Sequence, residues 1–151
     1  MVSPDINTYC ATIATMRLRK LFTPLRRARF QSQPTPKVTA DDASRIIRRD
    51  FPAESFAAVA AILSEYGSEK WQREQDRVLL AALKMSDGDL DMLRTQVRAA
   101  KLDYRDVLSA AEYPEYTKTG VFRVGKLPLK EQRRIIDSDW RQYHQWLRLM
   151  L

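Results

Sequence analysis

Apolar residues recur at intervals of three and four along most of the chain beyond residue 39, which is the spacing of one face of an α-helix. The most regular stretch covers residues 90–112: Leu90, Leu93, Val97, Ala100, Tyr104, Val107 and Ala111. It predicts either one long helix or two helices that break near Asp103, after a turn and cap at 86–89. We favour the break, because Asp103 with Asp106 three positions later can cap a second helix.

Capping residues and glycines predict three helices before this stretch, over the ranges 41–49, 53–66 and 69–85. Thr39, Asp41 and Asp42 can cap the first of them by accepting backbone N–H groups. Gly67 is placed to end the second helix, and Ser68 is placed to cap the third. All three helices carry apolar residues that can face a common core.

Prolines divide the remainder of the chain. Pro114 is expected to end the preceding helix, and residues 115–126 are expected to form a loop with a brief extended piece at 121–124. Pro128 opens a last helix, whose buried stripe is expected to be Leu129, Ile136, Trp140, Tyr143, Leu147 and Met150. Trp146 falls on a neighbouring face, so we expect it to contribute less to the core than Trp140 does.

These segments predict an all-α fold, an orthogonal bundle of five or six helices over residues 39–151. The four glycines are too few for the many tight turns of a β-sandwich or barrel. The chain also has no run of about 18 apolar residues, which a membrane-spanning helix would need.

Positive charge is concentrated before this domain. Residues 1–40 hold seven bases and one acid, a net charge of +6, whereas residues 41–151 hold 19 bases and 18 acids, a net charge of +1. We interpret residues 1–38 as a basic tail and linker, disordered or loosely helical, that is dispensable for the fold. A transit peptide, or a basic amphipathic helix over 16–30, are the alternatives.

Three stretches of the domain, LSEYGSEKWQREQDRVLLAALK, SDGDLDML and DYRDVLSAAEYPEY, resemble a group of short, uncharacterised bacterial helical proteins. The resemblance covers about residues 41–151 and not the tail. It implies a self-contained helical domain in a bacterial cytoplasm, and it implies no activity, ligand or catalytic residue.

Residues that would support metal or coenzyme chemistry are scarce. The chain has one histidine, His144, and one cysteine, Cys10, and it lacks the HExxH, CxxC and glycine-rich phosphate-binding motifs. Asp87, Asp89 and Asp91 fit a helix N-terminus better than a calcium loop, since the twelfth position of that loop would be Arg98. We therefore expect no cofactor and no metal, and an enzyme is the less favoured class.

Two functions of different classes remain. The first is a small non-enzymatic interaction or regulatory domain with a protein partner, whose surface would comprise Tyr104, Glu112, Tyr113, Glu115, Tyr116 and Trp146. The alternative is a nucleic-acid-associated protein that binds phosphate without sequence preference through the tail, by Arg17, Arg19, Lys20, Arg26, Arg27 and Arg29. A cytoplasmic location is expected in either case.

Overall fold

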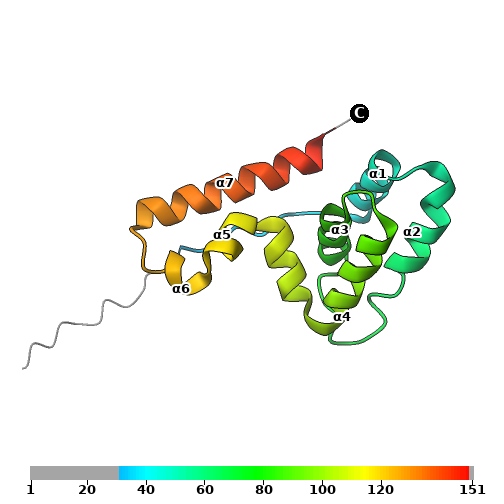
Figure 1. The fold of residues 1–151 in the computed structure, drawn as a ribbon, viewed down its shortest axis with the longest axis horizontal. Coiled ribbons are helices and arrows are strands. Elements are labelled where there is room, and N and C mark those ends of the chain that lie inside the picture. The colour runs from blue at the N-terminus through cyan, green and yellow to red at the C-terminus, as the bar shows by residue number, and fades with distance from the viewer. Residues whose placement is uncertain (1–30, 150–151) are drawn as a thin grey trace, which may run out of the picture.

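The computed structural model describes residues 31–149, and in this part of the chain it shows helices and no strand (Figure 1). The α-helices are α1 (Ala40–Asp50), α2 (Phe56–Leu63), α3 (Gln75–Ser86), α4 (Leu90–Glu112), α5 (Pro114–Thr119), α6 (Val121–Val124) and α7 (Leu129–Arg148). A single 3-10 turn, η2 (Ala53–Ser55), precedes α2. The predicted all-α class is confirmed, and none of the helices within 31–149 has the length and apolar character needed to cross a membrane.

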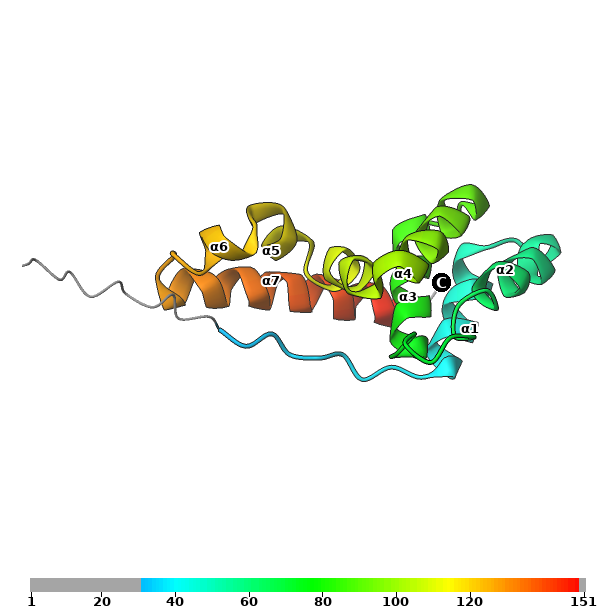
Figure 2. The same ribbon diagram turned by 90° about the horizontal axis from the view of Figure 1, so that it is seen from below.

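The helices form an elongated molecule (Figures 1 and 2). The helices α1, α2 and α3 gather with the first half of α4 at one end, and α5 and α6 lie at the other. The long helix α7 runs between the two ends, beside α5, with its last turn near α1. It joins two clusters of buried side chains, because Tyr143 and Leu147 belong to the core of the first end and Ile135 and Ile136 to that of the second.

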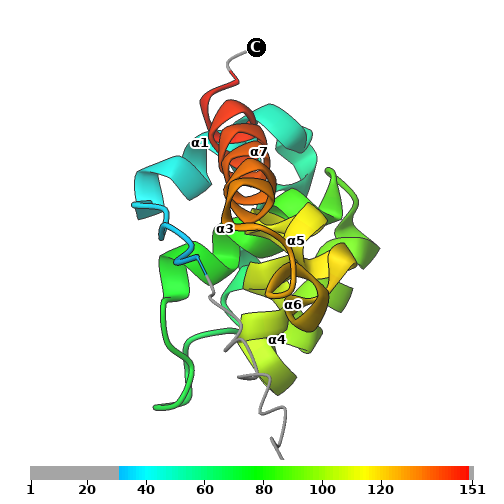
Figure 3. The ribbon, with the colours of Figure 1, turned by 90° about the vertical axis from the view of Figure 1, so that its left-hand side faces the viewer.

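Residues 31–39 form an extended segment that runs along α7 toward α1 (Figures 2 and 3). The backbone N–H of Gln31 donates to Oε1 of Gln132 at 3.1 Å, and the hydroxyl of Tyr113 donates to the carbonyl oxygen of Pro34. Pro36 is buried. This part of the predicted linker therefore packs on the helices, while residues 1–30 lie outside the described chain.

Local signals in the sequence placed several boundaries correctly. The backbone of α4 leaves helical geometry at Asp103 (φ −149°, ψ 102°), and Asp103 Oδ1 accepts the N–H of Arg105 at 3.0 Å, so the predicted break and the capping role of Asp103 are confirmed, without a bond from Asp106. Asp89 caps α4 by accepting the N–H of Met92 at 2.7 Å. At the start of α1, Asp42 Oδ2 accepts the N–H and the hydroxyl of Thr39.

The predicted loop at 115–126 is wrong, because this stretch forms α5 and α6. Pro114 opens α5, whose free N–H groups at Glu115 and Tyr116 are accepted by the carboxylate of Asp139 on α7. Val124 is fully buried in the second core, so packing overrides the strand preference of the residues of α6. With α5 and α6 included, the helices outnumber the five or six expected.

One further boundary and one buried stripe differ from expectation. The third helix begins at Gln75 and not at 69, because Glu74 has a left-handed backbone (φ 53°) and Gln72 holds a turn by accepting the N–H groups of Gly67 and Glu69. The buried side of α7 is also rotated from the predicted stripe, to Gln132, Ile135, Ile136, Asp139, Tyr143 and Leu147. Leu129 is 39% exposed and Trp140 is only partly buried, while Met150 lies outside the described residues.

Candidate functional site

The residues around 103–116 that were predicted to bind a protein partner do not form a continuous exposed surface. Glu112, Tyr113 and Tyr116 are 1%, 4% and 8% exposed, so they lie in the interior and cannot meet a partner in this conformation. Tyr104 and Trp146 are half-buried and pack against the first core, and Glu115 is exposed. The prediction is wrong for these residues because α7 and residues 31–39 cover the polar and tyrosine side chains at the end of α4.

Glu112 is buried because Arg77 of α3 neutralises it. The guanidinium donates from Nε and Nη2 to the two carboxylate oxygens, at 2.5 and 2.6 Å. Arg77 also pairs with Glu74 at its more exposed side. The hydrogen bonds to Glu112 raise the pKa of Arg77. This ion pair connects the start of α3 to the end of α4, which is a structural role.

Lys84 and Asp139 are two more charged groups inside the fold, where α4 meets α7. Lys84 Nζ donates to the carbonyl oxygen of Ala111 at 2.8 Å and lies 5.8 Å from the ring centroid of Tyr143. Burial lowers the pKa of Lys84. Burial also raises the pKa of Asp139, against the opposing effect of the N–H groups of α5 that it accepts. Each of the two charged groups is hydrogen-bonded to the backbone of a neighbouring helix, so a structural role explains why both are buried.

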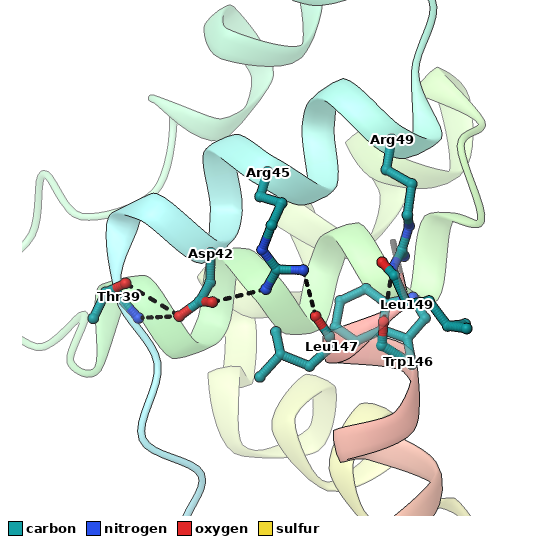
Figure 4. Close-up of polar contacts among 7 residues, drawn as sticks. All are labelled: Thr39, Asp42, Arg45, Arg49, Trp146, Leu147 and Leu149. Atoms are coloured by element: carbon teal, nitrogen blue, oxygen red, sulfur yellow. Dashed lines mark hydrogen bonds and ion pairs between the residues drawn. The ribbon is translucent and has the colours of Figure 1, made fainter. Parts of the chain in front are cut away.

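The end of α7 is held by two arginines of α1 (Figure 4). Arg45 donates to the carbonyl oxygen of Leu147 at 2.5 Å, and Arg49 donates to that of Trp146 at 2.7 Å. The guanidinium carbon of Arg49 also lies 5.3 Å from the ring centroid of Trp146. Cations at a helix C-terminus satisfy free carbonyls and oppose the negative end of the helix dipole. Trp146 is thus part of the scaffold, contrary to the expectation that it is an exposed aromatic.

The solvent side of α7 is strongly basic. We call this side the cationic face, because five exposed cations lie on it: Lys130, Arg133, Arg134, Arg141 and Arg148. At 100° per residue they fall on the side opposite the buried residues, together with Asp137, and Glu131 at the edge of the face pairs with Arg134 at 3.2 Å. The face extends over about 27 Å from its first cation to its last, at about 1.5 Å per residue. It can therefore span several successive phosphate groups of an extended polyanion.

Charge is unevenly distributed within the domain. Residues 41–116 hold 11 bases and 15 acids, a net charge of −4, whereas 117–149 hold eight bases and three acids, a net charge of +5. The backbone of Gln31 is bonded to Gln132 near the start of α7, so the basic segment that precedes it in the sequence is attached at the positive part. Its candidate phosphate contacts lie outside the described residues: Arg17, Arg19, Lys20, Arg26, Arg27 and Arg29.

A shallow depression lies on the C-terminal half of the cationic face. Its lining comes from α7 alone and consists of Trp140, Arg141, His144, Gln145 and Arg148. The rings of Trp140 and His144 meet edge-on, with centroids 4.2 Å apart and an interplanar angle of 61°. Nε2 of His144 is buried and has no hydrogen-bond partner among the described residues. The depression thus combines an aromatic wall with two guanidinium groups.

The sequence does not predict the cationic face from net charge, because the net charge of residues 41–151 is only +1. Net charges calculated for successive segments, or for one side of the last predicted helix, would indicate it. Comparison with protein-family models, curated proteins and solved structures finds no match. The function must therefore be inferred from the residues of this chain.

Proposed function

We propose that the protein is a small non-enzymatic interaction domain that binds nucleic acid through its phosphates. The observation that supports this function is the cationic face of α7, with five exposed cations against two acids, Asp137 and the Arg134 partner Glu131. Phosphate contacts supply most of the affinity of non-specific nucleic-acid binding, and they need positive charge that is accessible and aligned. The basic N-terminal segment, which precedes Gln31 in the sequence, adds six more bases and one acid to the chain.

A membrane surface or an acidic protein is the competing partner for a basic helix. An amphipathic helix that binds a membrane presents a row of large apolar residues to the lipid, but on α7 Ile135, Ile136 and Leu147 are buried and Leu129 at its start is the exposed aliphatic residue. A specific protein interface needs a desolvated apolar centre, and the tyrosines proposed for one are buried. Nucleic acid is the partner that this surface fits best.

The proposal retains three expectations from the sequence: an orthogonal arrangement of the helices, a basic N-terminal tail and a bacterial cytoplasmic setting. The tail and the cationic face would act together on one strand or duplex. If the five cations of α7 each neutralise one phosphate, the logarithm of the affinity falls against the logarithm of salt concentration with a slope of about −4.5 on a duplex and about −3.5 on a single strand. Contacts from the tail make the slope steeper.

The test is the binding of a fluorescent oligonucleotide of mixed sequence, measured by anisotropy over a range of salt concentrations. We expect Lys130→Gln with Arg134→Gln to weaken binding equally for different sequences and to reduce the slope by about 2, or about 1 per lost phosphate contact. The matched control is Arg48→Gln with Arg98→Gln, two exposed arginines on α1 and α4. Equal slopes for the two double variants would refute a role for the cationic face.

A further inference from the structure

The depression on α7 differs from the rest of the cationic face in chemistry. Along most of the face the side chains offer charge alone, whereas here the partly exposed indole of Trp140 lines the same depression as two arginines. Arg141 and Arg148 are seven residues apart, so they lie on the same side of the helix, two turns from each other. Gln145 lies between them along the helix and offers an amide that can both donate and accept.

This combination suits an unpaired nucleotide. Aromatic rings bind bases by stacking, guanidinium groups bind phosphate oxygens, and an amide can hydrogen-bond the edge of a base. His144 closes one side of the depression, and its edge-on contact restricts the orientation of the Trp140 ring. The ring is also anchored on its inner side by packing against the second core, so little ordering is needed when a base binds.

We infer that the nucleic acid is single-stranded and that one of its bases stacks against Trp140, with Arg141 and Arg148 on the neighbouring phosphates. This inference rests on the proposed function and adds the strand type. In a duplex the bases are stacked on one another and paired, so their faces cannot reach the indole. An acidic peptide or an anionic membrane uses the cations but supplies no base to stack on the indole, so the dependence of affinity on bases distinguishes the three partners.

The experiment compares Trp140→Leu with the wild-type protein on a single strand and on a duplex of the same length. Leucine keeps an apolar contact with the second core but lacks the aromatic face. Loss of one base–aromatic stack corresponds to a 5- to 150-fold weaker single-strand affinity, from about 1–3 kcal/mol. We expect the duplex affinity to change by less than about twofold, and Trp140→Phe to retain most of the single-strand affinity. Trp71→Leu, in the exposed loop before α3, is the control and should match the wild type.

A second measurement uses the unchanged protein, in case Trp140→Leu does not fold. An abasic oligonucleotide has the same phosphates but no bases, so the wild-type protein should bind it 5- to 150-fold more weakly than the normal strand, from the same stacking free energy of about 1–3 kcal/mol. Equal affinities for the two strands overturn the inference, and so does an equal effect of Trp140→Leu on strand and duplex. Preference for anionic vesicles over any oligonucleotide also overturns it. The salt slopes of the Lys130 and Arg134 variants test the proposed function separately.

Discussion

Arg77→Met removes the guanidinium that neutralises Glu112, and the structure predicts an asymmetric result for the two halves of this pair. Glu112 is 1% exposed and accepts two hydrogen bonds from Arg77, so the substitution leaves a buried carboxylate without its cation. Breaking a buried pair from one side costs about 3–5 kcal/mol of the free energy of unfolding. That is a large share of the roughly 5–15 kcal/mol of a typical domain.

Glu112→Gln is expected to cost less, about 1–3 kcal/mol, the penalty of losing one charged hydrogen bond. The side chain of Arg77 is 17% exposed and keeps its ion pair with Glu74, and glutamine still offers one acceptor oxygen. The double variant Arg77→Met with Glu112→Leu removes both charges, so it should be more stable than Arg77→Met alone.

Urea unfolding monitored by circular dichroism measures these differences as shifts in the midpoint at constant slope. Arg94→Met is the matched control, because Arg94 pairs with Asp91 on the surface of α4 and such pairs contribute about 0–1 kcal/mol. The reasoning is refuted if Arg77→Met costs no more than the control, or if Glu112→Gln costs more than Arg77→Met.

The remaining predictions concern pH and the N-terminal segment. Burial raises the pKa of Tyr66 to about 12 and also raises the pKa values of Tyr113 and Tyr143 above their ordinary value of 10.0. Because a raised folded-state pKa stabilises the protonated form, the contribution of these tyrosines to stability should be constant below pH 10.0 and fall progressively above it. Thermal melts with tyrosinate absorbance test this, and tyrosines that ionise at pH 10.0 without a loss of stability up to pH 12 contradict it. A chain that begins at Ala40 should be less stable than one that begins at Gln31 by about 2–4 kcal/mol in urea unfolding, because the buried hydroxyl of Tyr113 loses its acceptor and α1 loses its capping residue. Equal midpoints for the two chains would show that residues 31–39 contribute nothing.

The sequence by itself determined the features that depend on neighbouring residues. The three-and-four spacing over 90–112 predicted α4, and Asp103 predicted its break, because a helix and its caps use hydrogen bonds between residues at most about four positions apart. The all-α class followed from the same local patterns. Pro128 likewise marked the start of α7, since proline lacks the N–H that a first turn leaves unbonded.

Tertiary structure decided which polar residues are inside and which surface remains free. Glu112 is buried because a cation 35 positions earlier meets it, and α5 exists because Asp139, more than 20 positions later, accepts its free N–H groups. Gln132 is buried on α7 for a similar reason, as it bonds Gln31 and the carbonyl of Leu127. Periodicity counts only apolar residues, so it predicted the buried side of α7 without Gln132 and Asp139. For the same reason it gave no indication of the cationic face. Which side of a helix meets water depends on partners that lie far away in sequence, and the fold alone supplies them.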